Sequence, residues 1–405
     1  MDALMLPSTW QRVRLGDIGK PCMCKRVMKH QTTRYGEIPF YKIGTFGNTA
    51  DAFISKKLFL EYQTKYSFPK KGDILISASG TIGRAVIYDG KPAYFQDSNI
   101  VWIDNDETLV KNDFLFYAYS NVKWNTEHTT ILRLYNDNFR NTLIPLPPLN
   151  EQIAIANILS ALDRYLYSLD ALILKKESVK KALSFELLSQ RKRLKGFNQA
   201  WQRVRLGDMT TSFTKQTGFD YSASIKPTLI KEQLPNYIPF IQNKDFSGHY
   251  INYKTDYFIP NEIAIRFPQI LLNEKCLLIS IVGSIGNVAV FNHSQDAFTG
   301  CAIAVLKFKE KKSLDFVMHF LMSASGQKSL LNIVKASSHK SIILADLRDL
   351  LIPLPPLNEQ SAIADILSAL DKEIASLKNK KRQFENIKKA LNHDLMSAKI
   401  RVLKK

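Results

Sequence analysis

The sequence predicts an α+β fold with an internal repeat, in which a β-rich domain followed by one long helix occurs twice. The ten residues that begin at Leu143 recur unchanged from Leu351, at an offset of 208 residues. Short apolar runs separated by glycine, asparagine and aspartate precede each copy of this phrase, which is typical of β-strands. More than 40 residues without proline or glycine follow each copy, which is typical of a long helix. Two like units are therefore expected in one chain.

A second repeated phrase marks the start of each unit. The eight residues Trp-Gln-Arg-Val-Arg-Leu-Gly-Asp begin at Trp10 and again at Trp201, 191 residues later. Because the offset grows from 191 to 208 along the unit, the copies differ by insertions between shared landmarks, as in a duplicated scaffold whose loops have diverged. The predicted boundaries are 1–148 and 196–356 for the β-rich domains, and 149–195 and 357–405 for the helical regions.

Three strands are predicted within each β-rich domain, and a glycine turn joins the first two. The turns lie at 80–83 and 283–286. A Gly-x-x-Gly loop also clamps nucleic acid in KH domains, but strands rather than helices flank it here, which favours a turn. One short helix per copy is expected, at 113–119 and 315–322. The predicted strands are 73–79, 84–88, 99–103, 276–282, 287–291 and 301–306.

The phrase at Leu143 predicts a rigid junction between domain and helix. Three prolines in four residues exclude a helix and keep the chain extended. Asn150 is then a suitable N-cap, and the Glu151 carboxylate in the first turn complements the helix dipole. A helix from there to about Arg193 would be about 65 Å long.

Both predicted helices carry one apolar stripe, and the two stripes nearly coincide at the offset of 208. A long helix with a narrow apolar seam needs a partner, and the other copy is the simplest one, in an antiparallel coiled coil around a pseudo-twofold axis. One globular domain would then lie at each end, with the helices as a spacer. Two unrelated amphipathic helices on separate cores are the alternative. The predicted pairing residues are Leu159, Leu162, Leu166, Leu169, Leu183, Leu367, Leu370, Ile374, Leu377 and Leu391, and the stripe continues through Ile173, Val179, Leu187, Phe384, Ile387 and Leu395.

The charge of the chain favours a polyanionic partner. Lysine and arginine number 56 against 37 aspartate and glutamate residues, which leaves a net charge of +19 and a pI near 9.6. Basic groups that neutralise phosphates release condensed counterions, so this excess favours nucleic acid. The sequence lacks a run of about 18 apolar residues and a signal-peptide pattern, so no membrane association and a cytoplasmic location are expected.

The sequence offers no metal site or catalytic motif. The four cysteines are too few for a disulfide framework, and Cys22 and Cys24 lack a second ligand pair at zinc spacing, so ordinary reduced thiols are expected. There is no phosphate loop, no Asn-Pro-Pro-aromatic motif of an amino-methyltransferase and no Gly-rich dinucleotide fingerprint. No cluster of His, Cys and Asp recurs between the copies, although the structural landmarks do. A non-catalytic chain without a cofactor of its own is therefore predicted.

These features together resemble the specificity (S) subunit of type I restriction–modification systems, over essentially the whole chain from Trp10. The opening Trp-x-x-Val-Arg-Leu-Gly-Asp phrase and the duplicated Pro-Leu-Pro-Pro-Leu-Asn-Glu-Gln phrase before a leucine-rich helix carry the resemblance. It implies two target-recognition domains that each read one half of a bipartite site in double-stranded DNA, and an antiparallel coiled coil that sets half-site spacing and docks two modification subunits. Those partners would bind S-adenosylmethionine and methylate adenine. Restriction subunits, as further partners, would add ATP- and Mg-dependent translocation and cleavage.

The resemblance also implies base contacts in polar loops of the β-rich domains, near the hairpin after the Gly-x-x-Gly turn and just before the proline phrase. Arg, Lys, Asn and Gln have the geometry for base edges, although each is as readily a solvated residue or a phosphate contact. Because these loops differ between the copies, the two domains are predicted to read different sequences. The candidate DNA-binding residues are Arg84, Gln96, Asp97, Ser98, Asn99, Thr130, Arg133, Tyr135 and Asn136 in the first domain, and Asn287, Thr299, Gly300, Ser338, His339, Lys340 and Ser341 in the second.

Two other functions fit parts of the sequence. One is a coiled-coil scaffold whose heads bind RNA or protein, without a methyltransferase partner. The other, an enzyme that acts on nucleic acid by itself, is disfavoured by the missing motifs. A steep loss of DNA affinity with salt would separate a specificity subunit from the scaffold, because several phosphate contacts require it.

Overall fold

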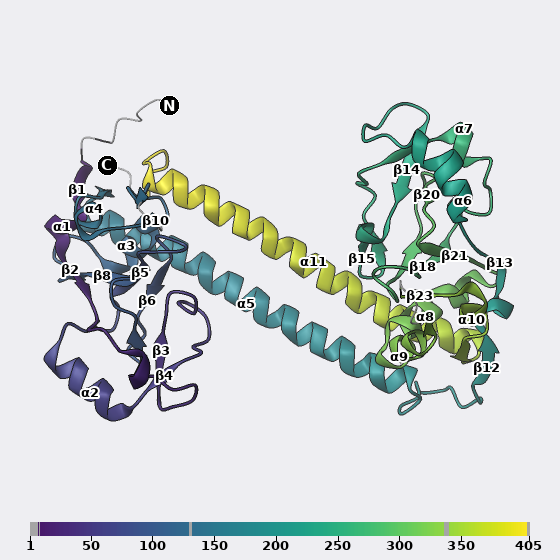
Figure 1. The fold of residues 1–405 in the computed structure, drawn as a ribbon, viewed down its shortest axis with the longest axis horizontal. Helices are drawn as coiled ribbons and strands as arrows, with labels where there is room; N and C mark the ends of the chain where they lie inside the picture. The colour runs from purple at the N-terminus through teal and green to yellow at the C-terminus, as the bar shows by residue number, and fades with distance from the viewer. Residues whose placement is uncertain (1–6, 8, 129–131, 336–339, 403–405) are drawn as a thin grey trace. The chain divides into compact units, whose positions relative to one another are not determined.

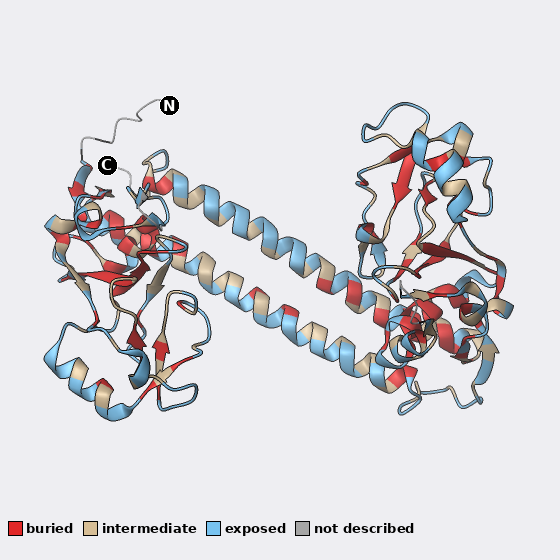
Figure 2. Cartoon of the chain, viewed as in Figure 1, coloured by how far each residue is buried: buried red, intermediate tan, exposed pale blue. Residues whose placement is uncertain are grey.

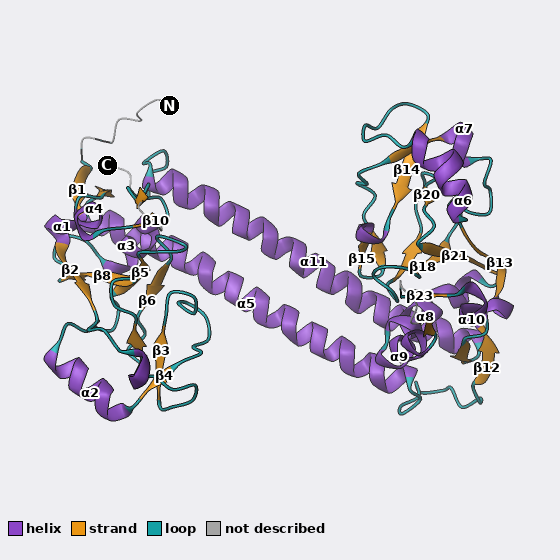
Figure 3. Ribbon diagram, viewed as in Figure 1, coloured by secondary structure: helices purple, strands orange, loops and turns teal. Residues whose placement is uncertain are grey.

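The computed structural model describes residues 7, 9–128, 132–335 and 340–402, coloured along the chain in Figure 1. It divides into two compact units. The first unit is Met1–Ala171 with Asn379–Lys405, and the second is Leu172–Lys378. Each unit contains one β-rich domain and a part of both long helices, α5 (Leu149–Leu188) and α11 (Leu357–Met396). The strands and helices that the two units share follow the same order along the chain, and the second unit has a few further elements, so the predicted α+β class and internal repeat are confirmed (Figure 3).

Each domain has a four-stranded antiparallel sheet at its centre, and the strand order is the same in both. The three strands predicted in each copy form the middle and one edge of this sheet, and a strand near the start of the unit adds the other edge. The first sheet is β2 (Gly19–Met23), β8 (Ile100–Asn105), β5 (Ile74–Ser77) and β6 (Ala85–Ile87). The second sheet is β13 (Thr210–Lys215), β21 (Ile303–Phe308), β18 (Cys276–Ser280) and β19 (Val288–Phe291).

A smaller mixed sheet in each domain contains the only parallel strand pairs among the described residues. Its central strand pairs antiparallel with one neighbour and parallel with the other. The loops that leave the carboxyl ends of the two parallel strands therefore emerge at the same edge of the sheet. The two sheets are β4 (Phe53–Ile54), β3 (Ile38–Tyr41) and β7 (Tyr94–Phe95), and β17 (Phe258–Pro260), β14 (Tyr237–Ile241) and β20 (Phe298–Thr299).

The two repeated phrases of each unit pair with each other. Strand β1 (Gln11–Arg14) lies antiparallel to β11 (Leu143–Leu146), and β12 (Gln202–Arg205) lies antiparallel to β24 (Leu351–Leu354). Each pair is an isolated two-stranded ribbon, where a proline can occupy a strand position because no further strand needs its missing N–H. The start of each domain is thereby tied to the segment that enters the long helix.

Shorter elements complete each domain. The predicted helices at 113–119 and 315–322 are confirmed as α3 (Asn112–Tyr119) and α8 (Lys311–Met322). The first domain also has α1 (Leu15–Ile18), α2 (Lys56–Lys65), β9 (Glu127–His128), β10 (Leu132–Arg133) and α4 (Asn136–Arg140). The second also has α6 (Gly218–Asp220), β15 (Phe246–Ser247), β16 (Tyr250–Ile251), α7 (Asn261–Ala264), α9 (Ala324–Asn332), β22 (Val334–Lys335), β23 (Ser341–Ile342) and α10 (Leu344–Arg348). Single irregular turns of helix lie at η1 (Lys29–Gln31), η2 (Leu206–Met209), η3 (Tyr221–Ile225), η4 (Lys226–Thr228) and η5 (Asn243–Asp245).

The long helices begin and end one to several residues away from the predicted positions. Helix α5 already includes Leu149, and the carbonyl of Pro148 accepts the first helical hydrogen bonds, so the predicted N-cap at Asn150 is wrong. The helix ends at Leu188, before Arg193, because Gln190 adopts a left-handed φ of 61° that no helix can continue. Helix α11 ends in the same way before Ala398, whose φ is 56°.

The helices run antiparallel within each unit. As the residue numbers rise along α5, those of the ion-pair partners on α11 fall from Lys388 to Asp371, with Glu177–Lys378 as the one exception in the sequence of pairs; this is the antiparallel order. Together with the apolar stripe they account for the predicted pairing. The ion pairs are Asp163–Lys388 and Asp170–Lys381 in the first unit, and Lys176–Glu373, Glu177–Lys378 and Lys180–Asp371 in the second.

Some residues of the apolar stripe pack into the domain cores, and others lie between the two helices (Figure 2). Leu159 belongs to the core of the first domain and Leu367 to that of the second, so each helix is part of a domain core where it begins. Val179 and Ile387, which are equivalent positions, are 40% and 50% exposed, so the stripe is interrupted there. The buried members are Leu159, Leu169, Ile173, Leu187, Leu367, Ile374 and Leu395. The half-buried members are Leu162, Leu166, Leu183, Leu370, Leu377, Phe384 and Leu391.

Each junction between domain and helix is closed by a buried glutamate of the proline phrase. In the first unit Glu151 accepts a hydrogen bond from Trp10 Nε1 at 3.0 Å and a pair of bonds from Arg401 at 2.6 and 2.9 Å. In the second, Glu359 accepts from Trp201 Nε1 at 3.1 Å and from two nitrogens of Arg193, both at 2.7 Å. Each glutamate pairs with one arginine and accepts from one tryptophan, and these bonds offset the cost of burying its charge.

Candidate nucleic-acid interface

Four predicted residues of the first domain, Gln96 to Asn99, form the loop at the carboxyl end of β7, which runs parallel to β3. The loop after β7 contains Gln96, whose side-chain oxygen accepts a hydrogen bond from the backbone N–H of Ile43 in the loop after β3, at 2.9 Å. The turn between β5 and β6 lies beside them. Gly80 and Gly83 have φ of 64° and 82°, and a Cβ on Gly83 would lie 2.1 Å from Trp124 Nε1, so glycine is required there.

A hydrogen-bonded network joins three of the predicted residues. Arg133 Nη2 donates to Asn99 Oδ1 at 2.9 Å and to Ser98 Oγ at 3.2 Å. The same Asn99 oxygen accepts from Ser79 Oγ at 2.8 Å. Strand β10 holds Arg133 next to Ser79 by an antiparallel bridge. A guanidinium has five N–H donors and these contacts use one nitrogen, so the network orients Arg133 while leaving donors for a ligand.

The remaining predicted residues of the first domain are placed with less mutual contact. Arg84 is exposed and donates through Nη1 to the carbonyl of Phe46 at 2.9 Å. Tyr135 and Asn136 are exposed at the start of α4. Thr130 lies outside the described residues.

A basic loop that the sequence analysis missed lies against this network. The loop between β2 and β3 exposes Lys25, Arg26, Lys29, His30 and Arg34. Arg26 reaches the predicted residue Asp97, with Nε 2.8 Å from Oδ2. The only sequence signal was the density of basic residues, which by itself does not distinguish a binding loop from a solvated one. Cys22 and Cys24, which lie where the loop begins, are free, and burial raises the pKa of the Cys24 thiol to about 12.

The second domain builds the corresponding surface from different side chains. Its hairpin β22–β23 approaches the turn at Gly283 through a bridge between Val282 and Ser341, as β9–β10 approaches the turn of the first domain. Asn287 and Lys340 are exposed, and Ser341 is half-buried. Ser338 and His339 lie outside the described residues.

The prediction for Thr299 is wrong. Its side chain is fully buried in β20, and its hydroxyl donates to the carbonyl of Ile241 at 3.2 Å. The residue follows Phe298 in the strand that runs parallel to β14, so it belongs to the core. Gly300, the next residue, lines a cavity of about 310 Å³ at the carboxyl ends of these strands.

This cavity adds candidate residues that the sequence did not indicate. Tyr221 and Phe240 stack with ring centroids 6.3 Å apart on its wall. Asn243 also lines it and donates to the carbonyl of Val282 at 2.7 Å, which ties the loop after β14 to the glycine turn. Asp256 raises the pKa of the neighbouring Lys244, and burial raises that of Tyr221, so both groups keep their protons. The polar groups, the aromatic pair and the cation together suit a nucleic-acid contact.

A comparison with protein families agrees with this geometry. Residues 7–177 and 198–386 each match the model of the type I restriction modification DNA specificity domain. The matches cover both repeats and most of the chain. The protein therefore belongs to this family: it is a type I restriction–modification specificity subunit with two DNA-recognition domains. The alternative of a scaffold with RNA- or protein-binding heads finds no support in the comparisons.

Individual relatives resemble the chain over different lengths. A candidate type I restriction enzyme specificity subunit of Haemophilus influenzae is 63% identical over 148 residues, which span 36% of this chain and only 38% of that protein. A type I restriction enzyme specificity subunit of Methanocaldococcus jannaschii is 27% identical over 99% of this chain and 95% of its own length.

The fold also matches a solved structure. The S subunit of a type I restriction–modification system from M. genitalium has a TM-score of 0.64 at 17% sequence identity, over 97% of this chain and 98% of that chain. At this identity the match concerns the fold alone. Within the described residues, no helix combines the length and the apolar character needed to span a membrane.

Proposed function

We propose that each DNA-recognition domain reads one half of a bipartite site in double-stranded DNA and that the two half-sites differ in sequence. One observation carries this proposal: the two candidate surfaces share a scaffold but not their polar side chains. The first presents Asn99 and Arg133 beside the glycine turn, whereas the second presents Asn243 and Ser341 at the corresponding edge. Different donors and acceptors match different base edges.

The long helices would set the distance between the half-sites and dock two modification subunits. The chain itself would be non-catalytic. S-adenosylmethionine would bind to the modification subunits, which methylate adenine, and ATP and Mg to restriction subunits where these take part. The net charge of +19 supports DNA as the ligand, because counterion release favours contacts with phosphate.

Methylation mapping tests the proposal. The chain is co-expressed with its modification subunits, and methylated adenines are mapped across the genome of the host cell. We expect one bipartite motif with a constant spacer. Replacing residues 9–142 with the first domain of a relative should change one half of the motif and leave the other half unchanged. Methylation without a common motif, or an unchanged motif after the exchange, would contradict the proposal.

A further inference from the structure

Two aspartates at equivalent positions of the repeat connect the helix pair to the DNA-recognition domains. Asp163 on α5 and Asp371 on α11 end the same Ser-Ala-Leu-Asp phrase, 208 residues apart. Each forms an ion pair with an equivalent lysine of the other helix, Lys388 and Lys180 respectively. Each also contacts a side chain of the domain in its own unit, and this second contact differs between the units.

In the first unit the domain contact comes from α3. The hydroxyl of Tyr117 donates to Asp163 Oδ2 at 2.7 Å, while Lys388 pairs with the other oxygen. The Lys388 ammonium also lies 5.5 Å from the centre of the Tyr117 ring. One carboxylate therefore joins the domain to both helices.

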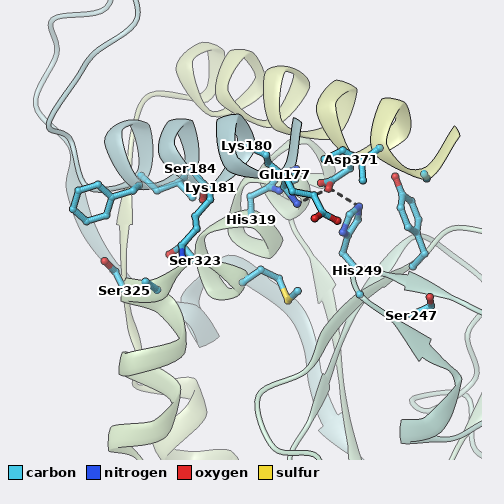
Figure 4. Close-up of a pocket in the computed structure, with 18 of the residues that line it drawn as sticks. Glu177, Lys180, Lys181, Ser184, Ser247, His249, His319, Ser323, Ser325 and Asp371 are labelled. Carbon is cyan, nitrogen blue, oxygen red and sulfur yellow. Dashed lines mark hydrogen bonds and ion pairs between the residues drawn. The ribbon is translucent and has the colours of Figure 1, made fainter. Parts of the chain in front are cut away.

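In the second unit the domain contact comes from a hairpin that the first domain lacks among its described residues. His249, in the turn between β15 and β16, places Nε2 3.3 Å from Asp371 Oδ2, and Lys180 pairs with the other oxygen (Figure 4). His319 on α8 lies at the position equivalent to Tyr117 but bonds Ser368 of α11 instead, at 2.9 Å. Asp371 is only 7% exposed, and its pair with Lys180 offsets the cost of burying the carboxylate.

A cavity beside Asp371 leaves few other contacts between the hairpin and the helices. A cavity of about 690 Å³ separates the hairpin and the start of α9 from the two helices, and Asp371 and His249 both line it. Apolar contacts elsewhere join domain and helices, but they are not directional and tolerate rotation. The polar contacts of the two aspartates instead hold particular atoms together. The Tyr117 hydroxyl donates to Asp163, and the His249 ring lies against the Asp371 carboxylate in a close contact that is not a hydrogen bond. Such contacts between specific atoms restrict how the domain is oriented on the helices.

We propose that Asp163 and Asp371 are positioning residues that hold each DNA-recognition domain in one orientation on the helix pair, and so restrict the half-site spacings that the subunit accepts. The inference rests on the proposed bipartite recognition. It assigns to the two aspartates a role in spacing and none in the choice of bases, because neither lies at the candidate nucleic-acid interface.

The test measures spacer selectivity. The complex of the full chain with its modification subunits methylates duplexes that contain the mapped half-sites at the native spacer and at spacers one or two base pairs shorter or longer. For Asp163→Ala and Asp371→Ala, methylation at non-native spacers relative to the native one should rise roughly tenfold, as expected for the loss of the polar contacts of one side chain. The bases required within each half-site should stay the same.

Matched controls lie on the same helices. Asp170 and Glu373 also form ion pairs between the helices, with Lys381 and Lys176, but among the described residues neither bonds to a side chain of a domain. Asp170→Ala and Glu373→Ala should keep the wild-type ratio. An unchanged ratio in Asp163→Ala and Asp371→Ala, or an equal change in the controls, would overturn the inference while bipartite recognition stands.

Two milder variants test the inference even if the aspartate substitutions prevent folding or abolish all methylation. Tyr117→Phe and His249→Gln remove or weaken only the contact from the domain and leave the aspartate–lysine pairs in place. They should raise the ratio in the same direction, with thermal unfolding close to that of the wild type; if neither does, the inference is wrong. If the wild-type complex methylates no bipartite site, the proposed function fails first and the inference fails with it.

Discussion

At the scale of single residues, the network around Arg133 explains how a recognition surface forms from distant positions. Ser98 and Arg133 are 35 residues apart and Ser79 is further away still, yet the loop after β7 and strand β10 bring them within hydrogen-bond distance. Ser98 adopts a left-handed φ of 54°, which turns the loop toward Arg133. The polar residue types were visible in the sequence, and the contacts that orient them were not.

Replacing Arg133 with alanine should weaken recognition of one half-site. One lost side-chain contact with a base typically costs about 1–3 kcal/mol, or roughly 5- to 150-fold in affinity. Methylation rates on duplexes with point changes in either half-site measure this, and selectivity should relax in the first half-site alone. Lys91→Ala, which removes a charge before β7 at the opposite end of the strand, is the control. Equal losses in both variants would argue against a base contact by Arg133.

His319 makes the stability of the second unit depend on pH. Burial in α8, aided by His249, lowers its pKa to about 3, whereas an unfolded histidine titrates near 6.5. Between these values the unfolded chain binds a proton that the folded chain does not, so stability is complete above pH 6.5 and falls as the pH is lowered toward 3. Protonation of His319 in the unfolded chain should therefore lower the free energy of unfolding by roughly 2 kcal/mol when the pH falls from 7 to 5.

Urea unfolding at several pH values checks this dependence. His319→Gln should reduce the loss of stability between pH 7 and pH 5, whatever its effect at pH 7. His30→Gln, at an exposed histidine of the first domain, should leave the pH dependence unchanged. If the free energy of unfolding of His319→Gln depends on pH as steeply as that of the wild type, groups other than His319 cause the pH dependence.

At the scale of elements, the proline phrase does more than keep the chain extended before the long helix. Its prolines keep it extended, as predicted, but it is also a β-strand that pairs with the opening phrase of the same unit. The glutamate that follows accepts from the tryptophan of that opening phrase and from an arginine beyond the end of a long helix. Three sequence landmarks therefore meet at one junction, which explains why they recur together.

Glu359→Ala should destabilise the second unit strongly. Glu359 is fully buried, and its loss leaves Trp201 Nε1 and the guanidinium of Arg193 without their acceptor. Breaking such a buried pair costs about 3 kcal/mol or more. Urea unfolding of the full chain measures the change. Glu186→Ala, which removes an exposed pair with Lys192, should cost less than about 1 kcal/mol, and a similar cost for both would contradict the role of the junction.

At the scale of the whole molecule, the net charge of +19 should appear as a steep salt dependence of DNA binding. If the assembled complex makes at least six phosphate contacts, its affinity for duplex DNA should fall about a thousandfold between 50 and 200 mM salt. Neutralising Arg26 and Lys29 should reduce the slope of log affinity against log salt by about one per lost contact. Lys71 and Lys91, at the turn opposite the candidate surface, are the matched pair whose neutralisation should change the slope less. A flat response of the wild type would contradict a phosphate-binding surface.

The fold could be predicted far more completely than the interface, and for a physical reason. Strands such as β5 and helices such as α3 follow from local patterns of apolar residues and turn residues, which act on neighbours in the chain. The parallel pair β3–β7 and the ribbon β1–β11 depend on contacts between distant segments, which local patterns do not encode. Thr299 shows the consequence: its residue type suited a DNA contact, but its strand places it in the core.

Sequence patterns alone were enough to predict that this protein is a duplicated unit of β-rich domain and long helix, that the helices share one apolar stripe, and that the chain resembles a specificity subunit. These properties can be read from repeats and periodicity because both copies contain the same local pattern of apolar, proline and turn residues. The folded structure was needed to show which polar side chains meet, which basic loop contacts them, and which aspartates connect the helices to the domains. Those properties depend on the distance between residues such as His249 and Asp371, and this distance exists only in the folded chain.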